Sequence, residues 1–222
     1  MSSGRSSTCA SRTRPAWERR PKARSRIATS SSFLSDWLAA VLATPGLTAL
    51  RDPARAREML LDDALRALPL VERYEGPLID VGSGGGSPGI PLASALPDRE
   101  VTLLDAEQRK CDFLRRWAPS NAEVAWGRAE EQPLERWGIA VAKALAQPPV
   151  AAELCLPLVG VGGAAILWLG REANLDRLAA ASERLGGGTP ELHDGLAVIP
   201  KVVPTPSRFP RRAGVAKKRP LA

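Results

Sequence analysis

One stretch decides the fold: Leu78-Ile79-Asp80-Val81-Gly82-Ser83-Gly84-Gly85-Gly86-Ser87-Pro88-Gly89-Ile90-Pro91. It is an apolar run that ends in an acid and continues into five glycines within eight residues. The pattern predicts a strand that enters a ligand-binding turn, because glycine tolerates positive φ and lets the backbone approach a ligand closely. Pro88 and Pro91 stand where a following helix can begin, and its N-terminus favours an anionic group. A plain flexible turn is the alternative interpretation.

Apolar periodicity on both sides of this stretch predicts an α/β protein. Helices are expected at 33–42, 53–68, 90–96, 108–117, 149–158 and 173–185. Strands are expected at 77–81, 101–105, 123–126, 138–142, 164–169 and 196–203. The alternation in the body is typical of a parallel sheet covered on both faces. Leu192 is placed in a partner strand across Asp194-Gly195, and this terminal antiparallel hairpin differs from the continued βαβ pattern of dinucleotide-binding Rossmann domains.

Composition bounds the class of protein. A chain of 222 residues suits one ample domain with extensions. No apolar run approaches the ~18 residues that a membrane span requires, and no apolar region follows the basic N-terminus as in a secretory signal. We therefore expect a cytoplasmic protein without membrane contact. Cys9, Cys111 and Cys155 are odd in number and widely spaced, which predicts free thiols and neither a disulfide framework nor a metal site.

Charge is segregated along the chain. Residues 1–26 and residues 201–222 each carry a net charge of +7, so the body between them carries −7. Basic ends on an acidic body suggest segments that hold phosphate backbones, although solvation alone is an open alternative. The sequence divides into a disordered basic segment (1–32), N-terminal helices (33–75), the main domain (76–203) and a basic C-terminal tail (204–222).

Two acids mark the predicted ligand site. Asp105 ends the second strand of the domain, at the same carboxyl edge of the sheet as the glycine turn, where a carboxylate can accept two ribose hydroxyls. An N-cap for the following helix is its alternative role. Asp80 is costly if buried unpaired, so it should hold turn N–H groups or a cationic ligand. The spacing Asp80-x-Gly82-x-Gly84-x-Gly86 suits S-adenosylmethionine better than NAD.

The region from Asp80 to Leu92 resembles the signature of the bacterial 16S ribosomal RNA guanine-N7 methyltransferases, also called glucose-inhibited division protein B. The flanking motifs agree with this family in order and spacing. They are Leu47–Pro53 at the helical entry, Leu103–Asp105 through Arg109-Lys110 to Phe113-Leu114, Gly127–Glu131, and the basic C-terminus from Lys201 to Gly214. The resemblance covers the chain from about residue 45 to its end.

This resemblance implies a class I methyltransferase fold, which is a Rossmann-like seven-stranded sheet with a C-terminal antiparallel hairpin and a small N-terminal helical extension. It implies S-adenosylmethionine as methyl donor and a guanine N7 of 16S ribosomal RNA in the small subunit as acceptor. We expect the protein to be a monomer. The cofactor contacts expected are Asp80, Gly82, Gly84, Gly86, Ser87, Asp105, Ala129, Glu130 and Lys143. The RNA contacts expected are Arg208, Arg211, Arg212, Lys217, Lys218 and Arg219.

The chain departs from the family pattern at several positions. Ala142-Lys143-Ala144 stands in place of Ser-Arg-Ala, and Leu60 replaces a histidine ahead of Asp63-Ala64-Leu65. Gly46 replaces the asparagine of the helical entry, and a lysine common in the fifth strand is replaced around Trp168. Lys143 keeps the positive charge of the arginine without its planar fork. It is our candidate for orienting the acceptor.

No residue is expected to act as a general base. Guanine N7 carries an in-plane lone pair and no proton, so positioning can do most of the work. His193, the single histidine, lies near a turn and is interpreted as structural. Two rival functions remain open at this point: a non-catalytic ribosomal RNA binding or assembly factor that keeps the fold, and an NAD-dependent oxidoreductase, whose fingerprint Gly84-x-Gly86-x-x-Gly89 is loosely matched.

Overall fold

The computed structural model describes residues 31–170 and 173–222. Within them, seven strands form one sheet in the order β3-β2-β1-β4-β5-β7-β6. Strands β1 to β5 run parallel, and β7 pairs antiparallel with both β5 and β6. The strands are β1 (Leu78–Val81), β2 (Val101–Asp105), β3 (Ala122–Trp126), β4 (Trp137–Ala142), β5 (Val159–Trp168), β6 (Glu191–His193) and β7 (Leu196–Pro200). The predicted α/β sheet with a terminal antiparallel hairpin is confirmed.

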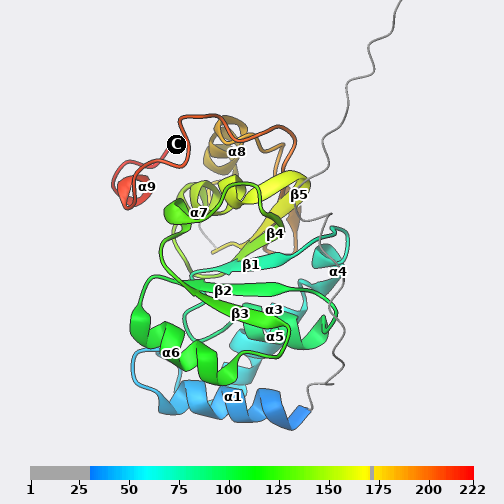
Figure 1. Cartoon of the computed structure of the whole chain (residues 1–222). Helices are drawn as coiled ribbons and strands as arrows, with labels where there is room; N and C mark the ends of the chain where they lie inside the picture. The colour runs from blue at the N-terminus through cyan, green and yellow to red at the C-terminus, as the bar shows by residue number, and fades with distance from the viewer. Residues whose placement is uncertain (1–30, 171–172) are drawn as a thin grey trace, which may run out of the picture.

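Helices cover both faces of this sheet (Figure 1). Successive strand residues point to opposite faces, so Leu78 packs with the N-terminal helices, α5 and α6, whereas Ile79 packs with α7, α8 and the C-terminal segment. The first layer contains α1 (Ser31–Ala43), α2 (Pro53–Ala56), η2 (Arg57–Asp62), α3 (Asp63–Leu65), α4 (Leu68–Val71), α5 (Gly89–Ala95) and α6 (Gln108–Trp117). The second contains α7 (Pro148–Cys155), η4 (Leu156–Leu158), α8 (Leu175–Arg184) and α9 (Val215–Lys218).

The second predicted helix, 53–68, is divided in the structure. Asp52 caps its start by accepting a hydrogen bond from Arg55 N at 2.8 Å, but the middle of the helix is the π-helix η2. The helix ends at Leu65, and Pro69 lies in the first turn of α4 rather than after the helix. A proline is tolerated there because the first helical N–H groups need no intrahelical acceptor.

Strand β5 begins five residues before the predicted start at 164. Its first half contains three glycines, which are poor strand formers, and the tight approach of β4 requires one of them, Gly163. A Cβ atom on Gly163 would lie 2.1 Å from the carbonyl oxygen of Gly138. The pairing of β4 with β5 is irregular at this point, since its register shifts between Trp137 and Ile139.

Residues 204–222, predicted as a basic tail, lie against the second helical layer. Phe209, Ala216 and Leu221 are buried, and Arg184 donates a hydrogen bond to the carbonyl oxygen of Leu221 at 2.5 Å. Lys201 anchors the start of the segment, because its buried ammonium donates to Leu185 O at 2.9 Å and Thr205 Oγ1 at 2.7 Å. These contacts make the segment part of the folded body.

Four further predictions concern the N-terminal segment, the cysteines, metal binding and membrane contact. The disorder expected for residues 1–32 falls outside the described residues up to residue 30, as does Cys9, but residues 31 and 32 belong to the first turn of α1, so the helix begins two residues before the predicted start. Cys111 and Cys155 are buried free thiols. In the described part of the chain, no group of side chains could hold a metal ion, and no helix is long and apolar enough to cross a membrane.

Candidate functional site

The glycine turn after β1 lies at the carboxyl edge of the sheet, as the sequence predicts. Gly82 has a φ of +77°, and a Cβ atom there would lie 2.5 Å from Leu145 Cδ1. Trp37 of α1 also fixes the turn, because its Nε1 donates a hydrogen bond to Gly85 O at 2.9 Å. The backbone at Gly82 is therefore confined to a conformation that only glycine adopts easily.

Asp80 lies fully buried beneath the turn. Its Oδ2 accepts the Gly89 N–H at 3.0 Å, whereas its Oδ1 has no hydrogen-bond partner among the described residues. Burial raises the pKa of Asp80 to about 7, against the lowering effects of the Ser83 hydroxyl, the Gly89 N–H and the charge of Lys143, while the charge of Asp105 raises it further. A buried oxygen without a partner fits a site that a cationic group completes.

The raised pKa of Asp80 predicts a pH dependence of stability. The folded protein binds one proton more than the unfolded chain between the ordinary aspartate pKa of about 4 and the folded value, so the free energy of unfolding should fall as pH rises through this window and level off above it. Asp80→Asn should lack this component. Urea unfolding of both proteins at about pH 5 and about pH 8 measures the difference. Parallel changes in the two proteins would refute the assignment.

A cavity beside the turn is formed at the ends of β1, β2 and β3, with one wall from α7. Asp105 lies in it, 7% exposed, with its two oxygens accepting backbone hydrogen bonds: Oδ2 from Gly84 N at 2.9 Å and Oδ1 from Glu107 N at 2.8 Å. Each carboxylate oxygen has a second acceptor site. Asp105 can thus order the glycine turn and the start of α6 while still accepting hydroxyls. The cavity is lined by Val81, Gly82, Leu104, Asp105, Ala106, Gly127, Arg128, Ala129, Glu130, Leu145 and Leu154.

Ala129 and Glu130 belong to the single turn η3 (Ala129–Glu131) at the rim of this cavity. The Glu130 side chain reaches toward the C-terminal segment, where its Oε1 accepts the Gly214 N–H at 2.9 Å. This part of the expected cofactor site is therefore fastened to residues that the sequence assigns to the tail. Sequence reasoning missed this contact because 84 residues separate its partners.

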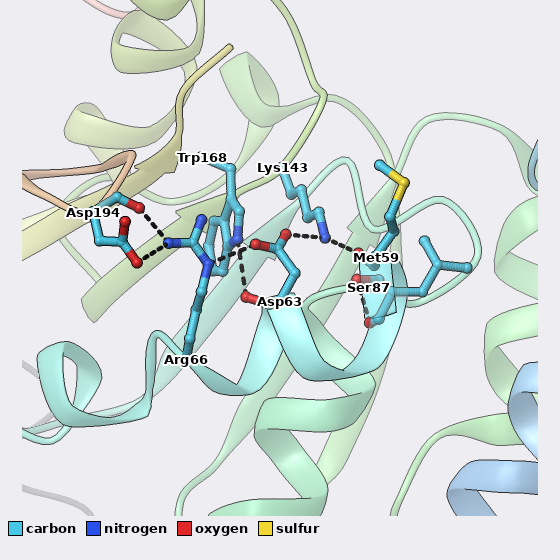
Figure 2. Close-up of polar contacts among 8 residues, drawn as sticks. Met59, Asp63, Arg66, Ser87, Lys143, Trp168 and Asp194 are labelled. Atoms are coloured by element: carbon cyan, nitrogen blue, oxygen red, sulfur yellow. Dashed lines mark hydrogen bonds and ion pairs between the residues drawn. The ribbon is translucent and has the colours of Figure 1, made fainter. Parts of the chain in front are cut away.

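Ser87 and Lys143 form a second group on the side of the N-terminal helices (Figure 2). The Ser87 hydroxyl donates to Leu60 O at 2.8 Å, and Lys143 Nζ lies 2.5 Å from Asp63 Oδ2 and donates to Met59 O. Neither residue lines the cavity that contains Asp105. The structure thus brings Gly82, Asp105, Ala129 and Glu130 together and places Ser87 and Lys143 apart from them, against η2 and α3. Gly84 donates its backbone N–H to Asp105 beside the cavity. Gly86 instead packs against the side chains of Trp37 and Ile90.

The six basic residues predicted to contact RNA are not equivalent. Arg211 is half-buried, and its guanidinium forms a bidentate ion pair with Glu153 of α7, which is 2% exposed. The pairing raises the pKa of Arg211. The other five side chains are exposed: Arg208, Arg212, Lys217, Lys218 and Arg219. Arg211 therefore fastens the segment, and the other five remain available to a partner.

Comparison with known proteins decides the family. The model of the family described as rRNA small subunit methyltransferase G matches residues 32–185, well over half of the chain. The chain belongs to this family. A member from Synechococcus sp. (strain JA-2-3B'a(2-13)) is 40% identical over 205 residues, which covers 80% of this chain and 79% of the relative. A member from Moorella thermoacetica is 37% identical over 197 residues, covering 79% and 82% of the two chains. Both are named ribosomal RNA small subunit methyltransferase G.

Two solved structures resemble the fold of this protein. A putative S-adenosyl-L-methionine-dependent methyltransferase from Methanococcus maripaludis aligns with a TM-score of 0.55 and 15% identity, covering 82% of this chain and 98% of that one. A complex of the Haloferax volcanii Trm112 activator and a putative methyltransferase aligns with a TM-score of 0.54 and 11% identity, covering 75% and 98%. At such identities the likeness establishes the class I methyltransferase fold.

Proposed function

We propose that this protein transfers a methyl group from S-adenosylmethionine to N7 of a guanine in 16S ribosomal RNA. Membership of the rRNA small subunit methyltransferase G family carries the proposal. The relatives from Synechococcus and Moorella thermoacetica are named as methyltransferases of small-subunit ribosomal RNA. The choice of guanine N7 rests on the resemblance of the Asp80–Leu92 signature, and a monomer fits a site that one chain supplies.

The residues present fit this cofactor. The buried Asp80 Oδ1 without a partner suits its ammonium group, and the cavity with Asp105 at the end of β2 suits its ribose. The positive φ at Gly82 and its contact with Leu145 bring bare backbone to the cavity wall. When bound, S-adenosylmethionine supplies an electrophilic methyl group on a sulfonium.

The chain's own contribution to the reaction is binding, orientation and exclusion of water. Guanine N7 offers a lone pair and loses no proton on methylation, so no side chain need act as a base. Holding two reactants in line recovers up to ~7–11 kcal/mol of the barrier. His193 agrees with this scheme, because it lies on the edge strand β6, three strands from β4, and faces Glu191 at 3.4 Å.

The five exposed basic residues of the C-terminal segment are proposed to contact RNA phosphates. The segment is fastened beside the cavity through Glu130 and Glu153, so these charges lie on the same body as the methyl-transfer site. Arg211 is excluded from the proposed set because its guanidinium is committed to Glu153. The NAD-dependent and non-catalytic alternatives are disfavoured by the family match, which is to a methyltransferase.

A transfer assay tests the proposed function. Small ribosomal subunits from a strain that lacks its own methyltransferase of this family are incubated with the protein and S-adenosylmethionine labelled in the methyl group. We expect label in the ribosomal RNA of the small subunit and none in large subunits. Tight cofactor binding without label in any RNA would favour the non-catalytic alternative, and competition by NAD for the cofactor site would favour the oxidoreductase.

A further inference from the structure

The segment from α2 to α3 is fastened across the carboxyl edge of the sheet by three of its backbone carbonyl groups (Figure 2). Met59 O accepts from Lys143, Leu60 O accepts from the Ser87 hydroxyl, and Asp63 O accepts from Trp168 Nε1 at 3.2 Å. The donors come from three separate places: the residue after β4, the glycine turn after β1 and the end of β5. Two of the carbonyl groups belong to the π-helix η2, and such helices are frequent at functional sites.

The side chain of Asp63 joins this segment to Lys143. Its Oδ2 lies 2.5 Å from Lys143 Nζ, and its Oδ1 accepts from Arg66 Nε at 2.6 Å. The side chains of Lys143 and Asp63 are only 14% and 27% exposed. Burial alone would raise the pKa of Asp63, but the hydrogen bonds from Lys143 and Arg66 outweigh this effect and lower it. The carboxylate is therefore ionised, and the pair is partly shielded from water, where charges attract more strongly than at the surface.

The contacts with Met59 and Asp63 leave Lys143 with one N–H donor for a further partner. An ammonium group has three N–H donors, and two of them are taken by Met59 O and the Asp63 carboxylate. A lysine stem is flexible, so without these two acceptors the charge would sample many positions. Lys143 directly follows β4, in which Val141 is the residue paired with Asp80 of β1, and its charge lowers the pKa of that buried acid. The held ammonium is thus near the turn that the proposed function assigns to the cofactor.

We propose that Asp63 is a positioning residue for methyl transfer, which acts by holding the Lys143 ammonium so that its third N–H is available to the acceptor guanine. The proposal rests on the proposed function. It assigns the α2–α3 segment a role beyond covering the sheet, since the same carboxylate that fastens the segment sets the position of the charge. Arg66 fastens the other side of Asp63 and extends the contact to Asp194 in the β6–β7 turn, whose backbone carbonyl accepts from Arg66.

A mutant series separates positioning from fastening. Asp63→Asn removes the charge at nearly constant shape, and Arg66→Gln breaks the other contact of the same carboxylate. Asp62→Asn is the matched control, because Asp62 is the preceding acid, half exposed, and lies 3.8 Å from Arg57. The series also includes Lys143→Ala and the double variant Asp63→Asn/Lys143→Ala. For each protein we would measure single-turnover methylation of small subunits at saturating cofactor, cofactor affinity and unfolding in urea.

The expected pattern is specific to a residue that acts through Lys143. Asp63→Asn should lower the single-turnover rate about 10-fold and Lys143→Ala about 10–100-fold, the scale of a misplaced orienting contact, with cofactor affinity within about twofold of the parent. The double variant should react no more slowly than Lys143→Ala alone, because the effect of Asp63 is lost once Lys143 is absent. Asp62→Asn should retain a rate near that of the parent, whereas Arg66→Gln, which keeps the contact of Lys143 but loosens Asp63, should react at a rate between those of the parent and Asp63→Asn.

A second readout does not depend on activity. Trace acetylation of the whole protein, mapped by mass spectrometry, should modify Lys143 several-fold faster in Asp63→Asn than in the parent or in Asp62→Asn. Additive rate losses in the double variant, or an unchanged rate in Asp63→Asn, would overturn the positioning role while leaving the proposed function intact. A parent protein that labels no RNA would refute the proposed function and the positioning role together. An unchanged acetylation rate would show that Asp63 does not hold Lys143.

Discussion

Arg211→Ala should destabilise the protein by about 3 kcal/mol, because removing one partner of a buried ion pair leaves the other charge uncompensated. Glu153 is 2% exposed, and the guanidinium of Arg211 supplies both of its hydrogen-bond donors. Arg211 also donates to Arg219 O at 2.8 Å, so its loss should release the end of the C-terminal segment as well. Urea unfolding of the parent and the variant measures the change.

A second variant distinguishes a structural role of Arg211 from RNA binding. The double variant Glu153→Leu/Arg211→Leu replaces the pair by apolar side chains and should recover most of the lost stability, since a buried ion pair is often no more stable than a hydrophobic replacement. Arg212→Ala is the control, because Arg212 is the exposed neighbour on the same segment. A loss of less than about 0.5 kcal/mol in Arg211→Ala, as for an ordinary surface residue, would contradict the structural role.

Asp105→Ala should weaken S-adenosylmethionine binding by about 1.5–3 kcal/mol, roughly 10–150-fold, because a charge-assisted acceptor for the ribose is lost. The structure adds a second reason for a large effect. The carboxylate accepts the Gly84 N–H and the Glu107 N–H, so its removal also leaves two backbone donors of the cavity unpaired. Calorimetric titration with the cofactor measures the affinity.

The control for this titration is Asp112→Ala on α6. Asp112 is exposed and pairs with Arg115 within its own helix at 2.7 Å, away from the cavity lining. It should bind the cofactor as the parent does. If Asp105→Ala remains folded and binds within about twofold of the parent, the ribose role of Asp105 is wrong.

Local patterns were sufficient to predict the elements that surround the cavity. The limits of β2 and α6 agree with the sequence prediction at every residue, because one is a short run of β-branched and apolar residues that ends in Asp105 and the other is a regular amphipathic helix. The hairpin of β6 and β7 was likewise signalled by Asp194-Gly195 between apolar residues. The first half of β5 could not be predicted in this way, because it is rich in glycine and the reason for Gly163, the approach of Gly138, is visible only in the fold.

The polar contacts of the site depend on residues far apart in the sequence, and no local pattern indicates them. Lys143 and Met59 are 84 positions apart, and Arg211 and Glu153 are 58 apart. Leu145 follows a strand but carries no signal that it would face Gly82. The glycine turn and Asp105 were predictable because a motif encodes them, whereas the partners of Ser87, Lys143 and Glu130 follow from tertiary packing.

The central claim is that the protein methylates guanine N7 of 16S ribosomal RNA, and the identity of the methylated nucleoside tests it most directly. Small subunits that lack the modification are reacted with S-adenosylmethionine carrying a labelled methyl group, and the ribosomal RNA is digested to nucleosides and analysed by mass spectrometry. We expect label in N7-methylguanosine, approaching one per subunit. Label in any other nucleoside, or an unmodified RNA after incubation with folded, cofactor-binding protein, would contradict it.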